Sequence, residues 1–167
     1  GWGLALSGRP TDAHREFLEA LAHKKDLGAR PRQVLYLAVL AWIMARVGDM
    51  SGAYREIAEA NRILKETGGE REWETFLHCY AGEVANLDTD GTPETAADSF
   101  KNAIARAQQQ GARSMELRAA AALAKLWIRE GKREAARKLL APIYGRFTEG
   151  FDTADLKDAE ALLDNLN

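Results

Sequence analysis

The side chains best suited to metal or nucleophilic chemistry are three histidines, His14, His23 and His78, and the single cysteine, Cys79. A zinc site needs three or four converging ligands. His14 and His23 lie about two and a half helical turns apart and would need a third ligand from elsewhere. Cys79 and His78 are adjacent, so on a helix they point to different faces and cannot act together as nucleophile and base. We therefore predict no metal site, and we expect Cys79 to be a small buried wall residue.

Carboxylates are abundant, but acid–base catalysis requires two of them held together in a pocket. Most fall on predicted solvent faces, among them Glu70, Glu72, Glu74, Asp152, Asp155 and Asp158. Glu83 is the exception, because its position places it on the inner face of a predicted helix. We predict no catalytic residue, no cofactor and no enzymatic activity for this chain.

The elements that would position these side chains follow from an internal repeat. Glycines recur at intervals of 40, 43 and 40 residues, and each is followed by an alanine, a bulky apolar residue and a further alanine or isoleucine at steps of five, four and three. The steps of four and three place the last three residues on one helix face. The four sets are Gly8, Ala13, Phe17 and Ala20; Gly48, Ala53, Ile57 and Ala60; Gly91, Ala96, Phe100 and Ala103; and Gly131, Ala136, Leu140 and Ile143.

A second series of glycines, Gly28, Gly69 and Gly111, falls between the first and predicts further helix ends. Each repeat then holds two helices. The predicted helices span residues 1–7, 11–26, 32–47, 50–67, 71–87, 93–109, 114–130, 132–147 and 153–165. Pro142 lies inside the eighth of these and is expected to kink or shorten it, and the turn after Leu87 holds about two extra residues.

This arrangement is the pattern of tetratricopeptide (TPR) repeats, with a period near 41 residues instead of 34. The predicted fold class is therefore all-α, a TPR-like right-handed superhelix of antiparallel helix pairs with a C-terminal capping helix. Its parts are a partial first repeat (1–27), three further repeats (28–68, 69–110 and 111–150) and the capping helix (151–167).

The stretch from Gly111 to Leu166 resembles the C-terminal end of large bacterial signalling proteins. Those proteins carry a class III adenylate or guanylate cyclase domain or another output domain, then an AAA-type ATPase, then a long TPR-like region. The most specific segment is LLAPIYGRFTEGFDTADL, residues 139–156. The resemblance implies a cytoplasmic signalling context and a fragment of a longer protein, which a start without Met inside a helical pattern also suggests. It carries over no catalytic residue, since the chain has no phosphate-binding loop motif.

In the TPR register, certain positions of each first helix face the concave side of the superhelix. The predicted groove residues are Trp42, Arg46, Tyr80, Glu83, Arg118, Lys125 and Arg129. The lining would change from apolar and aromatic near Trp42 to basic near Lys125, complementing a ligand with an apolar anchor and an acidic group. The alternative is that the superhelix fills its own groove, with Glu83 paired to Arg118 or Lys125.

The expected partner is a protein or peptide, or the catalytic half of the same protein. A formal net charge of −2 argues against nucleic acid, and the absence of a long apolar run argues against a membrane span. The uncovered apolar residues Trp2, Leu4 and Leu6 predict a homodimer through the N-terminal end. A small-molecule-sensing or enzymatic helical domain is the alternative function.

Overall fold

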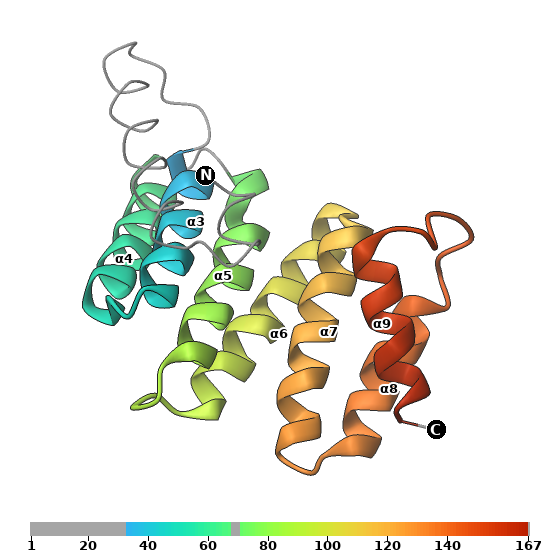
Figure 1. The fold of residues 1–167 in the computed structure, drawn as a ribbon. Coiled ribbons are helices and arrows are strands. Elements are labelled where there is room, and N and C mark those ends of the chain that lie inside the picture. Colours follow the sequence, from blue (N-terminus) through green and yellow to red (C-terminus); the bar gives the residue numbers. More distant parts are fainter. Residues whose placement is uncertain (1–32, 68–70, 167) are drawn as a thin grey trace.

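The computed structural model describes residues 33–67 and 71–166, and every regular element in these ranges is helical (Figure 1). The predicted all-α fold class is confirmed at this level. Each predicted helix in the described ranges is present, with ends within three residues of those expected. The helices predicted at 1–7 and 11–26 lie outside the described residues, as do His14, His23 and the residues on which the predicted homodimer rests. The elements are α3 (Gln33–Arg46), α4 (Met50–Thr67), a 3-10 turn η1 (Arg71–Trp73), α5 (Glu74–Leu87), α6 (Pro93–Gln110), α7 (Arg113–Arg129), α8 (Arg133–Tyr144) and α9 (Ala154–Asp164).

Consecutive helices pack as hairpins, α3 with α4, α5 with α6 and α7 with α8 (Figure 1). The first helices of successive hairpins also contact one another, α3 with α5 and α5 with α7, and α9 continues the series by packing on α7 and α8. The contact between α5 and α7 is small compared with that between α3 and α5. The first helices therefore form one side of the molecule, and the spacing between them decides where that side is open.

The predicted repeat register places small residues where helices approach closely. The alanines at the first position of this register are at most 1% exposed: Ala53, Ala96 and Ala136. Phe100 and Leu140, at the bulky position, are equally buried, whereas Ile57 is only half-buried. Gly82 shows why the facing position must be small, since a Cβ there would lie 2.6 Å from the Phe100 ring. The close contact of first and second helix thus depends on side-chain size at these sites.

The buried apolar residues divide into two clusters that meet at α5. The N-terminal cluster draws on α3, α4 and α5, and the C-terminal cluster draws on α5 to α9. From α5, Leu77, Tyr80 and Val84 belong to the first cluster, and Cys79 and Ala85 to the second. The helix α5 therefore joins two packing units through its opposite faces.

The helix ends follow the turn residues expected from the sequence. Gly48 and Gly131 adopt φ of 88° and 77° in the turns after α3 and α7, a left-handed conformation that favours glycine. The turn before α6 is two residues longer than those two, as predicted, and α6 begins with Pro93 after Thr92, whose Oγ1 accepts from the Thr95 amide at 3.4 Å. Pro142 lies inside α8, which ends at Tyr144, three residues earlier than predicted.

The last helix, α9, docks through an apolar stripe. Leu156 and Ala159 are buried, and the half-buried Leu162, Leu163 and Leu166 pack against the C-terminal cluster. Thr153 occupies the predicted N-cap position, but its side chain makes no capping hydrogen bond. The docking of α9 on α7 and α8 therefore rests on burial and on the ion pairs described below.

Candidate functional site

The side of the molecule formed by the first helices holds two adjoining cavities. We call the smaller, of about 180 Å³, the aromatic cavity; its lining residues are Trp42, Arg46, Cys79, Tyr80, Glu83, Met115 and Arg118. We call the larger, of about 530 Å³, the charged cavity; its lining residues are Glu83, Asn86, Arg118, Ala121, Ala122, Lys125, Ile128, Arg129, Asp155, Asp158 and Leu162. Glu83 and Arg118 line both. All seven predicted groove residues therefore lie at one or both cavities, brought there from α3, α5 and α7.

The aromatic cavity is walled by the packing of α3 on α5. The rings of Trp42 and Tyr80 lie 6.0 Å apart between centroids and are inclined at 51°, and both side chains are buried. The Arg46 guanidinium carbon lies 5.1 Å from the centroid of the Trp42 ring, a cation–π arrangement. Because Trp42 and Arg46 are one helical turn apart on α3, this stacking follows directly from their spacing. The result is an apolar recess with a cation at its edge.

Cys79 is 3% exposed in the wall of this recess, as the sequence predicted. Burial raises the pKa of its thiol to about 12, with a further contribution from the charge of Glu83. The thiolate is the reactive form of cysteine. Cys79 is therefore a neutral, apolar wall residue at physiological pH.

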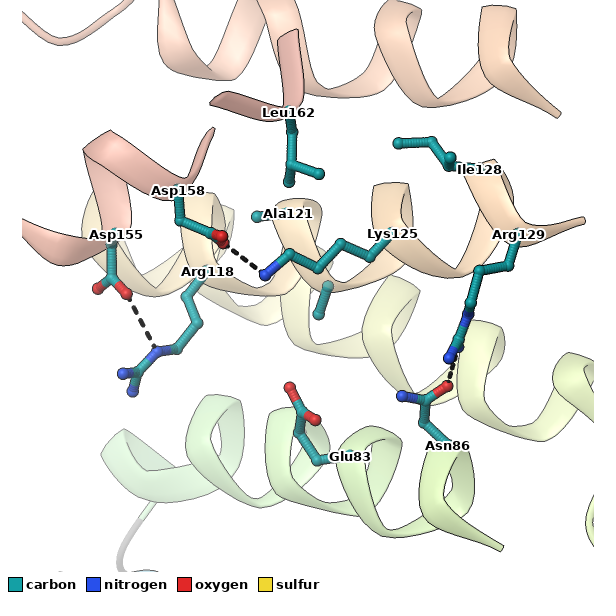
Figure 2. A pocket seen from close by; sticks show the side chains of 11 residues that line it. Glu83, Asn86, Arg118, Ala121, Lys125, Ile128, Arg129, Asp155, Asp158 and Leu162 are labelled. Carbon is teal, nitrogen blue, oxygen red and sulfur yellow. Dashed lines mark hydrogen bonds and ion pairs between the residues drawn. The ribbon is translucent and has the colours of Figure 1, made fainter. Parts of the chain in front are cut away.

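The charged cavity lies between α5, α7 and α9, with its cations on α7 (Figure 2). The Lys125 Nζ is 2.7 Å from Asp158 Oδ2, and the Arg118 Nε is 3.5 Å from Asp155 Oδ1. The alternative in which Glu83 pairs with Arg118 or Lys125 is therefore not what the structure shows, since both cations form ion pairs with α9. The cause is α9, whose first turns bring Asp155 and Asp158 against α7 when its leucine stripe docks.

The aspartates of α9 also change the expected charge of this end of the groove. Sequence reasoning placed Asp155 and Asp158 on a solvent face and described the lining near Lys125 as basic. The cavity instead holds three cations and three carboxylates. Arg129 donates a hydrogen bond to the side-chain oxygen of Asn86, a neutral acceptor on α5. The lining is therefore mixed in charge, and its cations differ in how they are compensated.

Glu83 projects from α5 into the space between the first helices, at the junction of the two cavities (Figure 2). It forms no hydrogen bond or ion pair with any described residue. Burial raises the pKa of its carboxyl group above the usual value, while the nearby charges of Lys125, Arg118, Arg46 and Arg129 oppose that rise. Desolvation thus exceeds the attraction of cations that surround the carboxylate without touching it.

Among the cavity residues outside the predicted groove set are Met115 of α7 and the two aspartates of α9, Asp155 and Asp158. The aspartates could have been found from the helical wheel of residues 153–165. Asp155 and Asp158 lie four residues before Ala159 and Leu162, so both adjoin the stripe that docks the helix. Met115 lies before the positions of its helix that the TPR register assigns to the groove, so the repeat pattern gave no reason to include it.

Another buried carboxylate, in the C-terminal half, is paired with residues of neighbouring segments. Glu116 on α7 is 2% exposed, accepts a hydrogen bond from Gln108 of α6 at 2.9 Å and pairs with Arg146. Arg146 follows α8, in the segment that leads to α9. This pair fixes the chain between α8 and α9 to α7.

The described residues include no group of three or more His, Cys, Asp or Glu placed to hold a metal ion. None of the described helices is long and apolar enough to cross a membrane. Comparison with models of protein families gives no match, and comparison with curated proteins gives none either.

Proposed function

We propose that this chain is a protein-interaction module that binds an extended segment of a partner along its first helices. The observation that carries this proposal is the convergence of residues from α3, α5 and α7 on two adjoining cavities that share Glu83 and Arg118. An apolar recess beside a charged one offers an anchor for a side chain and polar groups for orientation. The described residues bring no nucleophile–base pair to this surface, which favours binding over catalysis.

We further propose that the hairpins are TPR-like repeats of a right-handed superhelix, with α9 as its cap. The repeat spacing, the contact of Gly82 with Phe100 and the series of contacts α3–α5–α7–α9 support this reading. Such an array presents an extended concave surface. The resemblance of residues 111–166 to bacterial cyclase–ATPase signalling proteins favours a cytoplasmic regulatory role, in which the bound segment belongs to a partner or to the catalytic half of the same protein.

The second candidate is the sensing of a small molecule, and the volume of the charged cavity favours it. At about 530 Å³ the cavity lies within the range of ligand pockets, roughly 300–1,000 Å³. Its lining, however, includes six charged side chains, whereas small-molecule pockets are mostly apolar. A ligand of this kind would have to be charged or zwitterionic.

A peptide-display selection distinguishes the two candidates. A random library selected on the chain should enrich peptides that lose binding to the double variant Arg46→Glu, Arg129→Glu. The matched control is Lys65→Glu, Arg137→Glu, which makes the same charge change at exposed positions of α4 and α8. Peptides that bind both variants equally, or no enrichment at all, would contradict the interaction proposal. If no peptide is enriched, the small-molecule function is tested by thermal shift with charged metabolites. A stabilisation of the wild-type chain and of Lys65→Glu, Arg137→Glu that is lost in Arg46→Glu, Arg129→Glu would establish it.

A further inference from the structure

The inner surface of α3, α5 and α7 has a charge balance opposite to that of the whole chain. It carries four cations that act on one point, Arg46 from α3 and Arg118, Lys125 and Arg129 from α7, against the single carboxylate of Glu83. The chain as a whole has a formal net charge of −2. The first helices thus concentrate positive charge at the junction of the two cavities.

The four cations differ in their partners. Arg118 and Lys125 are paired with the aspartates of α9. Arg46 lies over the face of Trp42, and Arg129 donates to the amide oxygen of Asn86. Neither Arg46 nor Arg129 has a carboxylate partner among the described residues, and both side chains are exposed. Their positions are fixed by neutral groups, so their charge remains available to an anionic ligand.

Glu83 occupies the centre of this cation cluster. It lines both cavities, and its carboxylate is held by no direct partner in the described part of the chain. Asp155 and Asp158 of α9, the other carboxylates at the charged cavity, are engaged with α7. The remaining side chains that face Glu83 from its own helix, Cys79, Tyr80 and Asn86, carry no formal charge, and no charged residue of α4 or α6 lines either cavity.

We propose, on the basis of the peptide-binding function above, that the partner segment is acidic, that one of its carboxylates binds at the junction between Arg46 and Arg129, and that Glu83 takes up one proton when it does. The incoming anion lies beside Glu83 and favours its neutral form, so one solvent proton converts the carboxylate to the acid. The neutral acid can then donate a hydrogen bond to the ligand carboxylate. An apolar neighbour of the acidic residue fills the aromatic cavity of about 180 Å³ against Trp42 and Tyr80.

This coupling has a direction fixed by physical chemistry. Burial already raises the pKa of Glu83 in the free protein, and a bound anion raises it further. At a pH between the pKa of Glu83 in the free protein and its pKa in the complex, binding takes up a proton, so affinity increases as the pH falls. Replacing Glu83 with Gln removes the carboxylate charge, which strengthens binding of an acidic segment and abolishes the pH dependence.

The test uses fluorescence anisotropy with the full chain and three fluorescein-labelled dodecapeptides that share a central Leu and differ only in its two neighbours, which are Asp, Asn or Lys. We expect affinity to fall in that order, by roughly threefold for each partly exposed charge contact. Glu83→Gln should tighten binding of the Asp peptide by roughly threefold. The control Glu134→Gln, an equal charge change at an exposed position of α8, should leave it unchanged.

A fourth peptide with cysteic acid in place of Asp keeps its own charge constant with pH. Its affinity for the wild-type chain should rise between about pH 8 and about pH 5, and its affinity for Glu83→Gln should stay level across that range. A level wild-type profile would overturn the proton uptake. Equal effects of Glu83→Gln and Glu134→Gln would show that the ligand does not bind beside Glu83.

The remaining outcomes separate this inference from the function on which it rests. If the Asn or Lys peptide binds as tightly as the Asp peptide and Arg46→Glu, Arg129→Glu abolishes binding, the interaction function stands and the acidic partner is wrong. If no peptide binds at any charge, both are wrong. A single-stranded oligonucleotide that binds with the same dependence on Arg46 and Arg129 would assign the site to nucleic acid and overturn the acidic peptide.

Discussion

The aromatic and charged cavities lie on the same surface, but the helices around them are held together in different ways. Between α3 and α5, Trp42 and Tyr80 fill the space and are themselves buried. Between α5 and α7, the lining includes the short side chains of Ala121 and Ala122, and most of the longer residues there are charged. The aromatic cavity has a volume of about 180 Å³, whereas the charged cavity has a volume of about 530 Å³.

The difference agrees with the cost of burying apolar and charged side chains. Burying aromatic surface is favourable by itself, so α3 and α5 approach closely. Burying Lys125 and Arg129 fully would require each to be paired and desolvated at considerable cost. The α7 cations instead stay partly hydrated and pair at the rim with α9 or Asn86. The larger cavity thus lies where successive first helices have little mutual contact.

The largest effect should come from loosening the helix that closes the charged cavity. Leu156→Ala removes the most buried leucine of α9, which is 4% exposed against the C-terminal cluster. We expect a loss of about 2–5 kcal/mol in unfolding free energy, measured by urea denaturation. The aspartates that pair with α7 would lose their positions with the helix.

The matched control for this change is Leu166→Ala, at a half-buried position beyond the end of α9. The Leu166→Ala variant should lose clearly less unfolding free energy than Leu156→Ala. Equal stability of Leu156→Ala and the wild-type chain would mean that α9 does not hold the C-terminal half together.

The next prediction concerns the buried alanine at the same sequence position of two hairpins, α3 with α4 and α7 with α8. Ala53 on α4 and Ala136 on α8 are both 0% exposed at equivalent repeat positions. Leucine at either site overfills a close helix contact, and we expect each variant to lose about 1–3 kcal/mol of stability. Thermal denaturation followed by circular dichroism measures both.

The control variants are Ala58→Leu and Ala135→Leu, on the same helices at exposed positions. These should unfold close to the wild-type temperature. A large loss of stability in Ala136→Leu with none in Ala53→Leu would show that the helices of the two hairpins pack differently at this position despite the shared spacing.

The helices could be predicted from the sequence because their signals are local. Glycine at the turns, alanine and bulky residues in fixed steps, and Pro93 at a helix start each act within one or two turns of helix. The same register placed Trp42, Tyr80 and Glu83 on one surface, and all three line the aromatic cavity.

The charge pattern of the site could not be predicted because it depends on contacts between helices. The register brings Lys125 near Glu83 and near α9 alike, and it does not say which carboxylate comes within ion-pair distance. That choice follows from how deeply Leu156 and Ala159 dock, a tertiary property. The size of the charged cavity likewise depends on how little α5 and α7 touch.

The smallest expected effect concerns the pH dependence of stability at Glu83. Burial raises the pKa of this carboxyl group in the folded chain above its value in the unfolded chain. Below the unfolded value the group is protonated in both states and costs nothing; as the pH rises through the folded value, it ionises in the folded protein and the unfolding free energy decreases. Glu83→Gln removes this loss, so it should match the wild-type chain in acid and be slightly more stable near neutral pH. The four surrounding cations offset part of the desolvation, and we therefore expect a gain below the roughly 1 kcal/mol typical of a partly exposed charge. Urea denaturation of the two chains and of Glu134→Gln across the acid-to-neutral range measures it. A Gln variant less stable than wild type at neutral pH would mean that the attraction of the cations outweighs burial, and that Glu83 stabilises the first-helix surface instead of holding a place for a ligand.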